Sequence, residues 1–375
     1  MKTMIWLGAA AFCLVIAVGA HQTEPSAHSN ADPLQVVGIG DMSVERAAHQ
    51  ATRLASGKVL ITGGCSGQCD TTLDQVEAFD PPTGKFESMP PMATARDSHA
   101  AVALEDGRVL VAGGWSQRRA TASVELFDPA SGRFNTAAEM TQPRAVPVAT
   151  RLADGRVLIT GGQTSQMTPL NTAELFDPAS TRFSATGSMR SARIGHTAVA
   201  LADGRVLVAG GLEARRGAVL RSAEVFDPVS GRFEPTGDMA FPRQKHAAVR
   251  LSDGKVLIIG GSDSGPRSDR YRSTELYDPV TGSFSPGPDM QWQRYKLPDA
   301  AVLLPTGEVL VAGGAEHLER YDPTGQRFVP LSGKLSGPQE FATASLLDNG
   351  DILVLGGYDE QVRTSASAWL VRMPN

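Results

Sequence analysis

The chain has 375 residues, of which 41% are hydrophobic and 20% are charged, so it holds enough apolar side chains for a large buried core. Its net charge of -5 leaves no excess of Lys and Arg to neutralise a phosphate backbone, which argues against nucleic acid as the main partner. The 39 Gly and 24 Pro indicate an unusual number of turns.

Residues 1–20 predict an export signal. Lys2 precedes an apolar run that reaches Ala20, and the small residues at its end suit cleavage before His21. An uncleaved membrane anchor is the alternative, because the run is at the short limit for crossing a bilayer. Lipid attachment at Cys13 is not expected, since the bulky Phe12 precedes it. Residues 21–33 have hardly any apolar side chains and are expected to form a disordered linker.

Cys65 and Cys69 are the cysteines that remain after removal of the signal. We expect a disulfide between them, because an exported protein resides where disulfides persist. Two free thiols are the alternative. No metal and no other cofactor is expected, since no third or fourth ligand has a matching spacing.

Double glycines mark seven similar units in the rest of the chain. They stand at Gly63-Gly64, Gly113-Gly114, Gly161-Gly162, Gly210-Gly211, Gly260-Gly261, Gly313-Gly314 and Gly356-Gly357. Each pair ends a segment such as residues 99–114, where two apolar runs flank Asp106-Gly107. Asp-Gly between strand-like runs predicts a tight hairpin, with positive φ expected at both central residues. Residues 123–134 predict a second hairpin, so one unit is four short antiparallel strands.

Strands of this length cannot form a stable core alone, so the units must stack on one another. Radial stacking suits the period and the Gly content, and small residues such as those in "AAVAL" and "VAGG" fit where the innermost strands converge. The sequence therefore predicts an all-β propeller over residues 34–375.

The two ends of the chain are expected to share one blade. In the fourth strand of each unit an aromatic residue is followed by Met and then by Arg, as in Phe86, Met92 and Arg96, and Val36, Met42 and Arg46 repeat that spacing. Residues 34–46 therefore read as a fourth strand without its first three. The seventh unit has a third strand near residues 368–371 and no fourth. The N-terminal strand should complete it, close a ring of seven blades and remove two open sheet edges.

The segments "VLVAGG", "VELFDP" and "GRF" (residues 109–114, 124–129 and 132–134) resemble the Kelch-repeat family, whose fold is a β-propeller. The resemblance covers residues 35–372 and looks like a bacterial variant, with Phe at most positions where the family has Tyr or Trp. The family includes protein-binding adaptors, sugar-active oxidases and sialic-acid epimerases, so the resemblance alone does not select a function. A copper radical oxidase is not expected, because both mature cysteines lie in one loop. A family epimerase normally has six blades.

Residues that recur in nearly every unit are interpreted as structural. An Arg precedes the first strand of six units, and a Glu recurs in the third strand of the same six; the seventh has Gln339 and lacks the Glu, so the two should pair within each blade. A His also recurs three residues after the Arg, at His49, His99, His196 and His246. These histidines fall in four blades and are too dispersed for one metal ion.

Residues unique to one unit are the candidate ligand-binding residues. The loops between second and third strands should lie on one face and carry Arg118, Arg119, Arg215, Arg216, Arg221, Arg267, Arg270 and Arg272. This arginine rim suits an anionic partner, such as an acidic glycan or a carboxylate-bearing peptide. Simple solvation of these loops is the alternative.

The sixth unit departs from the repeat. It has two extra residues after Arg294, and it contains Trp292 and Tyr295, an aromatic pair suited to a sugar or peptide. Packing against the closing blade is the alternative. If the protein is an enzyme on an acidic sugar, similar to an epimerase or mutarotase, proton transfer would fall to Lys296, Asp299, Glu316 or His317.

The sequence favours an exported, monomeric binding or scaffold propeller, periplasmic or secreted, for an anionic protein or glycan. No nucleophile and base pair is evident, so catalysis is the alternative. No stable membrane insertion is expected after removal of the signal.

Overall fold

The computed structural model describes residues 34–213, 217–263 and 270–372. The expected export signal (1–20) and linker (21–33) lie outside these ranges, as do Arg215, Arg216 and Arg267 of the arginine rim. Within the ranges described, no helix is long and apolar enough to cross a membrane.

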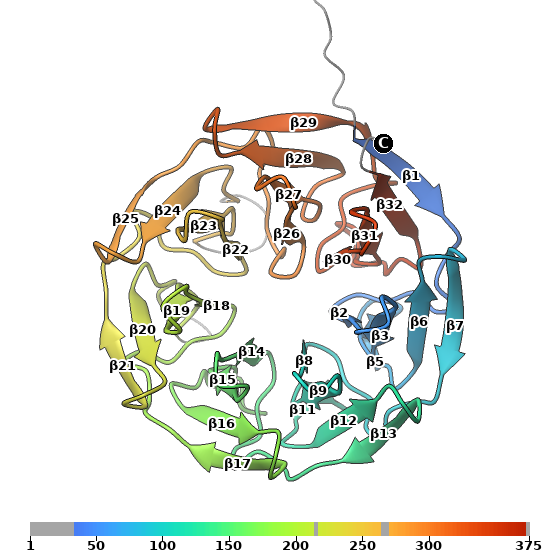
Figure 1. The fold of residues 1–375 in the computed structure, drawn as a ribbon, viewed down its shortest axis with the longest axis horizontal. Helices are drawn as coiled ribbons and strands as arrows, with labels where there is room; N and C mark the ends of the chain where they lie inside the picture. The colour runs from blue at the N-terminus through green and yellow to red at the C-terminus, as the bar shows by residue number, and fades with distance from the viewer. Residues whose placement is uncertain (1–33, 214–216, 264–269, 373–375) are drawn as a thin grey trace, which may run out of the picture. The chain divides into compact units, whose positions relative to one another are not determined.

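The strands form seven four-stranded antiparallel blades arranged in a ring, with the first strand of each blade nearest the centre (Figure 1). Five blades are separate sheets, and the last two are joined edge to edge into one eight-stranded sheet. Blade 1 consists of β2 (Gln50–Arg53), β3 (Val59–Thr62), β6 (Val76–Asp80) and β7 (Lys85–Met89), and blade 2 consists of β8 (Ala100–Ala103), β9 (Val109–Ala112), β12 (Val124–Asp128) and β13 (Arg133–Thr136). Blade 3 consists of β14 (Val148–Arg151), β15 (Val157–Thr160), β16 (Ala173–Asp177) and β17 (Arg182–Ala185). Blade 4 consists of β18 (Thr197–Ala200), β19 (Val206–Ala209), β20 (Ala223–Asp227) and β21 (Arg232–Pro235). Blade 5 consists of β22 (Ala247–Arg250), β23 (Val256–Ile259), β24 (Thr274–Asp278) and β25 (Ser283–Pro286). Blade 6 consists of β26 (Ala301–Leu303), β27 (Val309–Val311), β28 (His317–Asp322) and β29 (Arg327–Lys334). Blade 7 consists of β30 (Thr343–Leu346), β31 (Ile352–Leu355), β32 (Ala368–Arg372) and β1 (Gln35–Ile39). The predicted seven-bladed propeller is confirmed.

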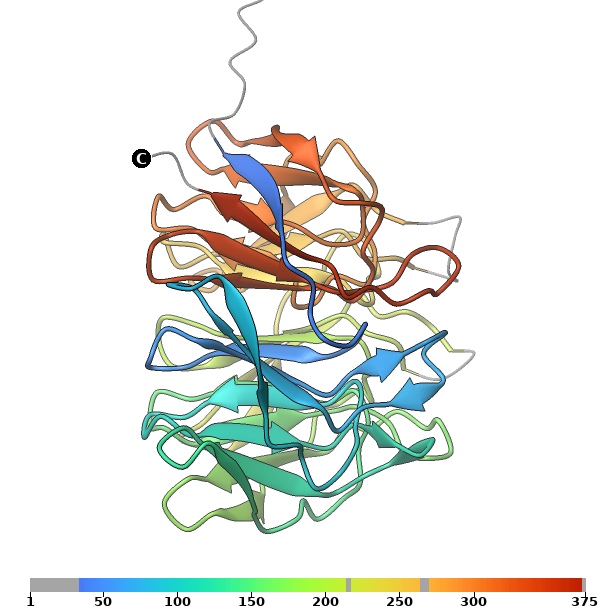
Figure 2. The same ribbon diagram turned by 90° about the vertical axis from the view of Figure 1, so that its right-hand side faces the viewer.

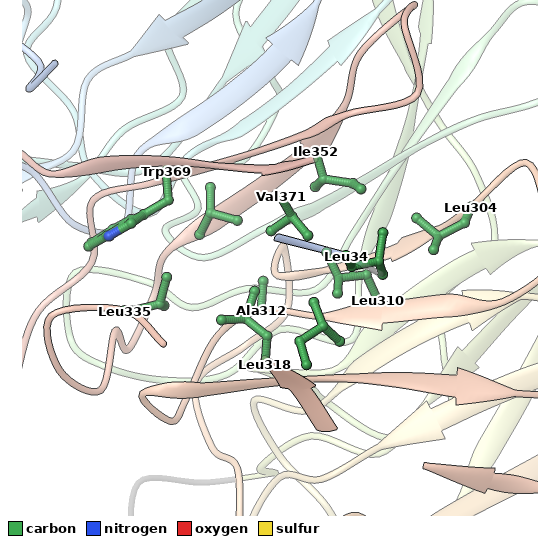
Figure 3. Close-up of a cluster of buried hydrophobic side chains, with 11 residues drawn as sticks. Leu34, Leu304, Leu310, Ala312, Leu318, Leu335, Ile352, Trp369 and Val371 are labelled. Atoms are coloured by element: carbon green, nitrogen blue, oxygen red, sulfur yellow. The ribbon is translucent and has the colours of Figure 1, made fainter. Parts of the chain in front are cut away.

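The N-terminal strand closes the ring, as predicted. β1 runs antiparallel to β32, with Gln35 opposite Arg372 and Ile39 opposite Ala368, and it also touches β29 of blade 6 through one bridge. Leu34, just before β1, joins a buried cluster with Trp369 and Val371 of blade 7 and with leucines of blade 6 (Figure 3). The strand therefore seals both a sheet edge and the apolar interface between two blades.

The tight turns differ from the predicted ones in one respect. In the turn after β8, Gly107 has a φ of 87°, but Asp106 stays in the ordinary region. The NH of Gly107 donates to the carbonyl of Leu104, and the NH of Leu104 donates to the carbonyl of Arg108. This is a type I turn followed by a left-handed glycine. The expectation of positive φ at both central residues is thus wrong, because the longer loop needs it only at the glycine.

The propeller has two different faces (Figure 2). Because the strands alternate in direction, the turns between strands 1 and 2 and between strands 3 and 4 share one face, which we call the turn face. The opposite face, the loop face, carries the connections between blades and those between strands 2 and 3. Two of the latter form small hairpins, β4 (Cys65–Ser66) with β5 (Thr71–Thr72), and β10 (Trp115–Ser116) with β11 (Arg119–Ala120).

The recurring arginines and glutamates form buried ion pairs, as predicted. The pairs are Arg46–Glu77, Arg96–Glu125, Arg144–Glu174, Arg193–Glu224, Arg243–Glu275 and Arg294–Glu319, with N to O distances of 2.7 to 3.0 Å. Arg144 also donates to the carbonyls of Gly161 and Thr172. One guanidinium thus ties the segment that enters a blade to its second and third strands. Blade 7 lacks this pair and has Gln339 and Trp369 instead, both buried.

Deletion of residues 34–39 should lower the thermal unfolding midpoint by about 10 °C or more, because it removes several buried apolar side chains and exposes the edge of β32. A chain that starts at residue 33 keeps β1 and serves as the control. Differential scanning calorimetry of both truncated chains measures the effect. Equal midpoints for the two would contradict the closure.

Replacement of Arg144 by Met should destabilise the fold by about 3–5 kcal/mol, because Glu174 is left buried without its partner. Replacing both, Arg144→Met with Glu174→Leu, should recover most of that loss. Urea unfolding measures both effects. Arg151→Met, which breaks an exposed pair with Glu105 of 3.6 Å, provides a control that should change stability by less than about 0.5 kcal/mol. A double variant as unstable as Arg144→Met would contradict this account.

Candidate ligand site at the mouth of the central cavity

A central cavity of about 430 Å³ lies among the innermost strands. Small residues such as Ala100, Ala149, Ala198 and Ala248 form much of its wall, because larger side chains do not fit where the blades converge. The cavity is therefore a property of the propeller, while its chemistry depends on the few larger residues that reach it.

The entrance of the cavity on the loop face is surrounded by one residue from each blade, which we call the mouth ring. Its members each stand two positions after the recurring Arg, or after Gln339 in blade 7: Ala48, Ser98, Val146, Gly195, Lys245, Lys296 and Phe341. Every member has a left-handed backbone, with φ between 48° and 66°. Such values are uncommon for residues other than glycine, and Val146 is β-branched, so the fold imposes this conformation whatever the side chain.

Backbone hydrogen bonds join neighbouring members of the mouth ring. The NH of Ser98 donates to the carbonyl of Ala48, that of Lys296 to Lys245, and that of Phe341 to Lys296, at 2.7 to 3.0 Å. The links Ala48 to Phe341, Val146 to Ser98 and Lys245 to Gly195 follow the same rule. Because the backbone is held in this way, the ring presents its side chains at fixed positions, and all of its residues but Lys296 line the cavity.

The large side chains of the mouth ring lie on one side of it. Blades 1 to 4 contribute Ala, Ser, Val and Gly, whereas blades 5 to 7 contribute Lys245, Lys296 and Phe341. Gly195 has a further role, because a Cβ there would lie 3.2 Å from Cγ of Lys245. The absence of a side chain in blade 4 thus leaves room for the stem of Lys245.

Aromatic rings surround both lysines. Lys245 Nζ lies 5.4 Å from the ring centre of Tyr295 and 5.8 Å from that of Phe341. Lys296 Nζ lies 4.8 Å from the ring centre of Tyr358 and is also near the other two rings. Burial raises the pKa of Tyr295 to about 12, so this ring stays neutral and attracts the ammonium groups through its π face.

Glu340 is the carboxylate that neutralises this cluster. It is buried and accepts from Lys296 Nζ at 2.6 Å and from Arg270 Nη2 at 2.5 Å. Arg270 also lies over Tyr295, at 5.9 Å from the ring centre. Two cations thus share one carboxylate.

Lys245 makes no ion pair among the described residues. Its pKa is lowered to about 8, mainly by burial and in part by the nearby charge of Lys296, while Glu340 offsets part of this effect. At neutral pH most Lys245 side chains therefore carry a positive charge, and no carboxylate of the described residues forms an ion pair with it. This residue was not singled out from the sequence, nor were Glu340, Phe341 and Tyr358.

The two extra residues of blade 6 bring Asp299 into the central cavity. Asp299 accepts a hydrogen bond from Gln50 of blade 1 at 3.1 Å, and its carbonyl accepts from the NH of Ala344 in blade 7. The side chain is open to the cavity but surrounded by protein, which raises its pKa. Lys296 and Asp299, both predicted as candidate residues, thus belong to the mouth and the cavity.

Glu316, His317 and Trp292 make their contacts with one another. The Trp292 and His317 rings stack with centres 4.5 Å apart, and Glu316 lies 3.2 Å from His317 Nε2 and 3.3 Å from Lys334 Nζ. Trp292 therefore does not form a joint aromatic surface with Tyr295, which is buried at the mouth. The four proton-transfer candidates fall into two separate sets of contacts.

The described members of the arginine rim have different environments. Arg221 pairs with Asp238 at 3.3 Å and Arg272 with Asp289 at 3.1 Å. Arg118 lines a second cleft of about 710 Å³, together with Trp115, which also borders the central cavity. Arg119 is exposed in β11. Among the described members of the arginine rim, Arg270 is the one whose contacts place it in the mouth cluster.

The repeated histidines are structural, with each Nε2 2.9 to 3.0 Å from a threonine hydroxyl. The pairs are His49–Thr343, His99–Thr62, His196–Thr160 and His246–Thr197. Burial lowers the pKa of His196 to about 3, with a further contribution from the charge of Arg193. These rings are therefore neutral at physiological pH and tie adjacent blades together.

The predicted disulfide is present in the hairpin of β4 and β5, where it joins Cys65 to Cys69. Within the ranges described, no group of three or more His, Cys, Asp or Glu residues is placed to hold a metal ion.

Comparisons with known proteins support the repeat and the fold. A family model for the Kelch motif matches residues 53–93, 98–141 and 245–291, which are the regions of blades 1, 2 and 5. A novel fungal alcohol oxidase of the AA5 family, solved in complex with copper, has a similar structure, with a TM-score of 0.72 over 91% of this chain and 76% of that chain. The identity is 17%, so this likeness shows the fold alone. No curated protein sequence matches the chain. The described residues do not fit a copper site, since the buried histidines lie in four blades and bind threonines.

Replacement of His196 by Gln should reduce the acid sensitivity of the fold. Between pH 6.5 and about 3 the unfolded chain binds one more proton at this residue than the folded chain does, so stability falls as the pH falls, by about 1.4 kcal/mol per pH unit. Urea unfolding at pH 6 and pH 4 should show this slope reduced in the variant. Thr160→Val, which keeps the buried ring, should lower stability at both pH values with the slope kept. An unchanged slope in His196→Gln would contradict a neutral buried histidine.

Proposed function

Since the chain is a Kelch-repeat protein with a seven-bladed propeller, we propose that it is a binding module that captures an anionic ligand at the mouth ring. The observation that carries this proposal is the charge of Lys245, which has no ion-pair partner in the part of the chain that the structure describes. Three cations, Lys245, Lys296 and Arg270, meet at the mouth, and Glu340 is shared by two of them. A bound carboxylate would complete the missing pair.

The location of the site favours an oxyanion. An ammonium group that is partly removed from water interacts more strongly with an anion than a solvated surface lysine does. The rings of Tyr295 and Phe341 limit the directions from which Lys245 can be reached, and the cavity beyond it has room for part of a ligand. The ligand class is therefore a carboxylate-bearing glycan or protein segment.

The loop face offers further contacts to a large ligand. Arg118 and Arg119 are exposed there, and Trp115 separates the central cavity from the second cleft. A glycan chain that starts at Lys245 would cross Trp115, whose ring provides contact area at a low entropy cost. The arginine rim then attracts the ligand, while the mouth holds its terminal carboxylate.

The proposal includes export. Residues 1–20 have the pattern of a signal, and the disulfide of Cys65 and Cys69 fits an oxidising compartment such as the periplasm or the exterior. Catalysis on an acidic sugar is less well supported, because Lys296 is paired with Glu340, while Glu316 and His317 make their contacts with Trp292 and Lys334.

Trigalacturonate should bind to the purified protein, and Lys245→Met should weaken binding by at least about tenfold, because a charge-assisted contact is lost. Isothermal titration calorimetry measures the affinity. Lys255→Met on the turn face, where Lys255 pairs with Asp253 at 3.9 Å, removes the same charge and should leave the affinity unchanged. The uncharged trigalactose should not bind.

The affinity of the wild-type protein should also fall as the pH rises through about 8, since Lys245 loses its proton there. Lys245→Met should lack this dependence. Equal effects of Lys245→Met and Lys255→Met would refute a site at the mouth, and binding of trigalactose would refute an anionic ligand.

A further inference from the structure

We propose that Lys245 is a carbonyl-capturing residue, which forms an imine with an aldehyde or ketone that enters the central cavity. This inference concerns the nucleophilicity of the amine and does not depend on the capture of an anion. It rests on the position of the side chain, the groups that surround it and the room in front of it.

The position of Lys245 differs from that of the other described lysines. Lys58, Lys255, Lys296 and Lys334 each have a carboxylate partner, at Glu87, Asp253, Glu340 and Glu316 respectively. A carboxylate partner favours the protonated form, which is not nucleophilic. Lys85 makes no ion pair among the described residues but is exposed at the start of β7, outside the cavity. Among the described lysines, Lys245 alone combines the lack of a carboxylate partner with a place on the cavity wall.

The groups around Lys245 favour the neutral amine. Burial disfavours the charged form of Lys245, and the ammonium of Lys296, which lies near the same rings of Tyr295 and Phe341, repels a second positive charge. The two rings themselves attract the ammonium and oppose this effect. A second cation beside a desolvated lysine is a known way to activate an amine. Glu340 opposes this effect, but its two oxygens are bound by Lys296 and Arg270. The pKa of Lys245, lowered to about 8, agrees with this balance.

The backbone around Lys245 holds the amine at the cavity. The residue is a member of the mouth ring, with its NH bonded to the carbonyl of Gly195 and its carbonyl bonded to the NH of Lys296. Its stem lies against Gly195, where a side chain would crowd it. The cavity of about 430 Å³ in front of it holds a small carbonyl compound with ease.

The reaction is a condensation with balanced atoms. The lone pair of Nζ attacks the carbonyl carbon, the C=O π electrons move to the oxygen, and proton transfer from nitrogen to oxygen gives a carbinolamine. Loss of the hydroxyl group with one proton, as water, gives the imine. Asp299 lines the same cavity, and burial raises its pKa, so we assign to its carboxyl group the donation of a proton to the leaving hydroxyl.

The test uses propanal, which carries no charge, with sodium cyanoborohydride to reduce the imine to a stable propyl adduct. Peptide mass spectrometry of the intact, folded protein then gives the rate of labelling at each lysine. At pH 7.5 we expect Lys245 to react at least about tenfold faster than Lys85, because its pKa of about 8 leaves a sizeable fraction of the amine unprotonated and it lies on the cavity wall. Equal rates at the two residues would overturn the proposal.

Two variants separate this activity from anion binding. Lys245→Arg keeps the positive charge, so it should bind trigalacturonate more tightly than Lys245→Met does, but it should remove the fast-reacting site. Lys245→Met should lose both. A wild-type protein that binds trigalacturonate without fast labelling of Lys245 would refute imine formation and support anion binding. Fast labelling of Lys245 without binding of trigalacturonate would support imine formation and refute anion binding.

Lys296→Met provides a further readout. Removal of the neighbouring charge should raise the pKa of Lys245, so the midpoint of the labelling rate against pH should move upward, and the rate at pH 7.5 should fall severalfold. Lys85→Arg is the matched control and should leave the profile of Lys245 unchanged. A profile that does not respond to Lys296→Met would contradict activation by the adjacent cation. Circular dichroism of each variant checks that the propeller is retained.

Discussion

The buried guanidinium groups are the interaction on which the rest of this structure depends. In six blades an Arg from the incoming segment is paired with a Glu of the third strand and donates to the carbonyl that ends the second strand. A charge buried in this way is tolerated because its hydrogen bonds are satisfied. In these six blades the pair anchors the segment that carries the mouth-ring residue two positions after the Arg. Phe341 of blade 7 has the same left-handed backbone without such a pair, so the hydrogen bonds between ring members also hold this conformation.

In this propeller the backbone conformation at the mouth ring is constant, while the side chains at the same positions vary. At the mouth ring the backbone is left-handed in every blade, yet the side chains include Ala, Ser, Val, Gly, Lys and Phe. The fold thus accepts the strain of these conformations, on the order of 1 kcal/mol each, and leaves the side chain free. Lys245 and Lys296 occupy two adjacent positions of this kind. The fungal oxidase with a similar fold was solved with copper, whereas the axial histidines described here bind threonines, so likeness of fold does not transfer the chemistry.

Much of the architecture could be predicted from the sequence, because the residues that build each blade are the same amino acids at the same spacing in most blades. The spacing of Val36, Met42 and Arg46 predicts the closing strand, and the joint loss of Arg and Glu in the seventh unit predicts their pairing. The mouth ring could not be found in this way, since it repeats as a backbone conformation and its residues differ from blade to blade. A signal was nevertheless present. The residue two positions after the recurring Arg differs from blade to blade. Its place is set by the repeat while its side chain can change, so such a position is available for ligand binding, and Lys245 occupies one of them. Partners from distant loops, such as Glu340, require the tertiary structure.

The pairing of β1 with β32 also has a consequence in time. During synthesis β1 leaves the ribosome before every other strand of the propeller, and its antiparallel partner is translated last. The blades between them can fold as they are synthesised. The backbone NH and CO groups of β1, however, stay without their strand partner until β32 has been translated. A chain that ends before β32 would leave β1 unpaired and the ring open, and such an exposed edge favours aggregation. A chaperone that binds the N-terminal segment would protect the chain during this interval.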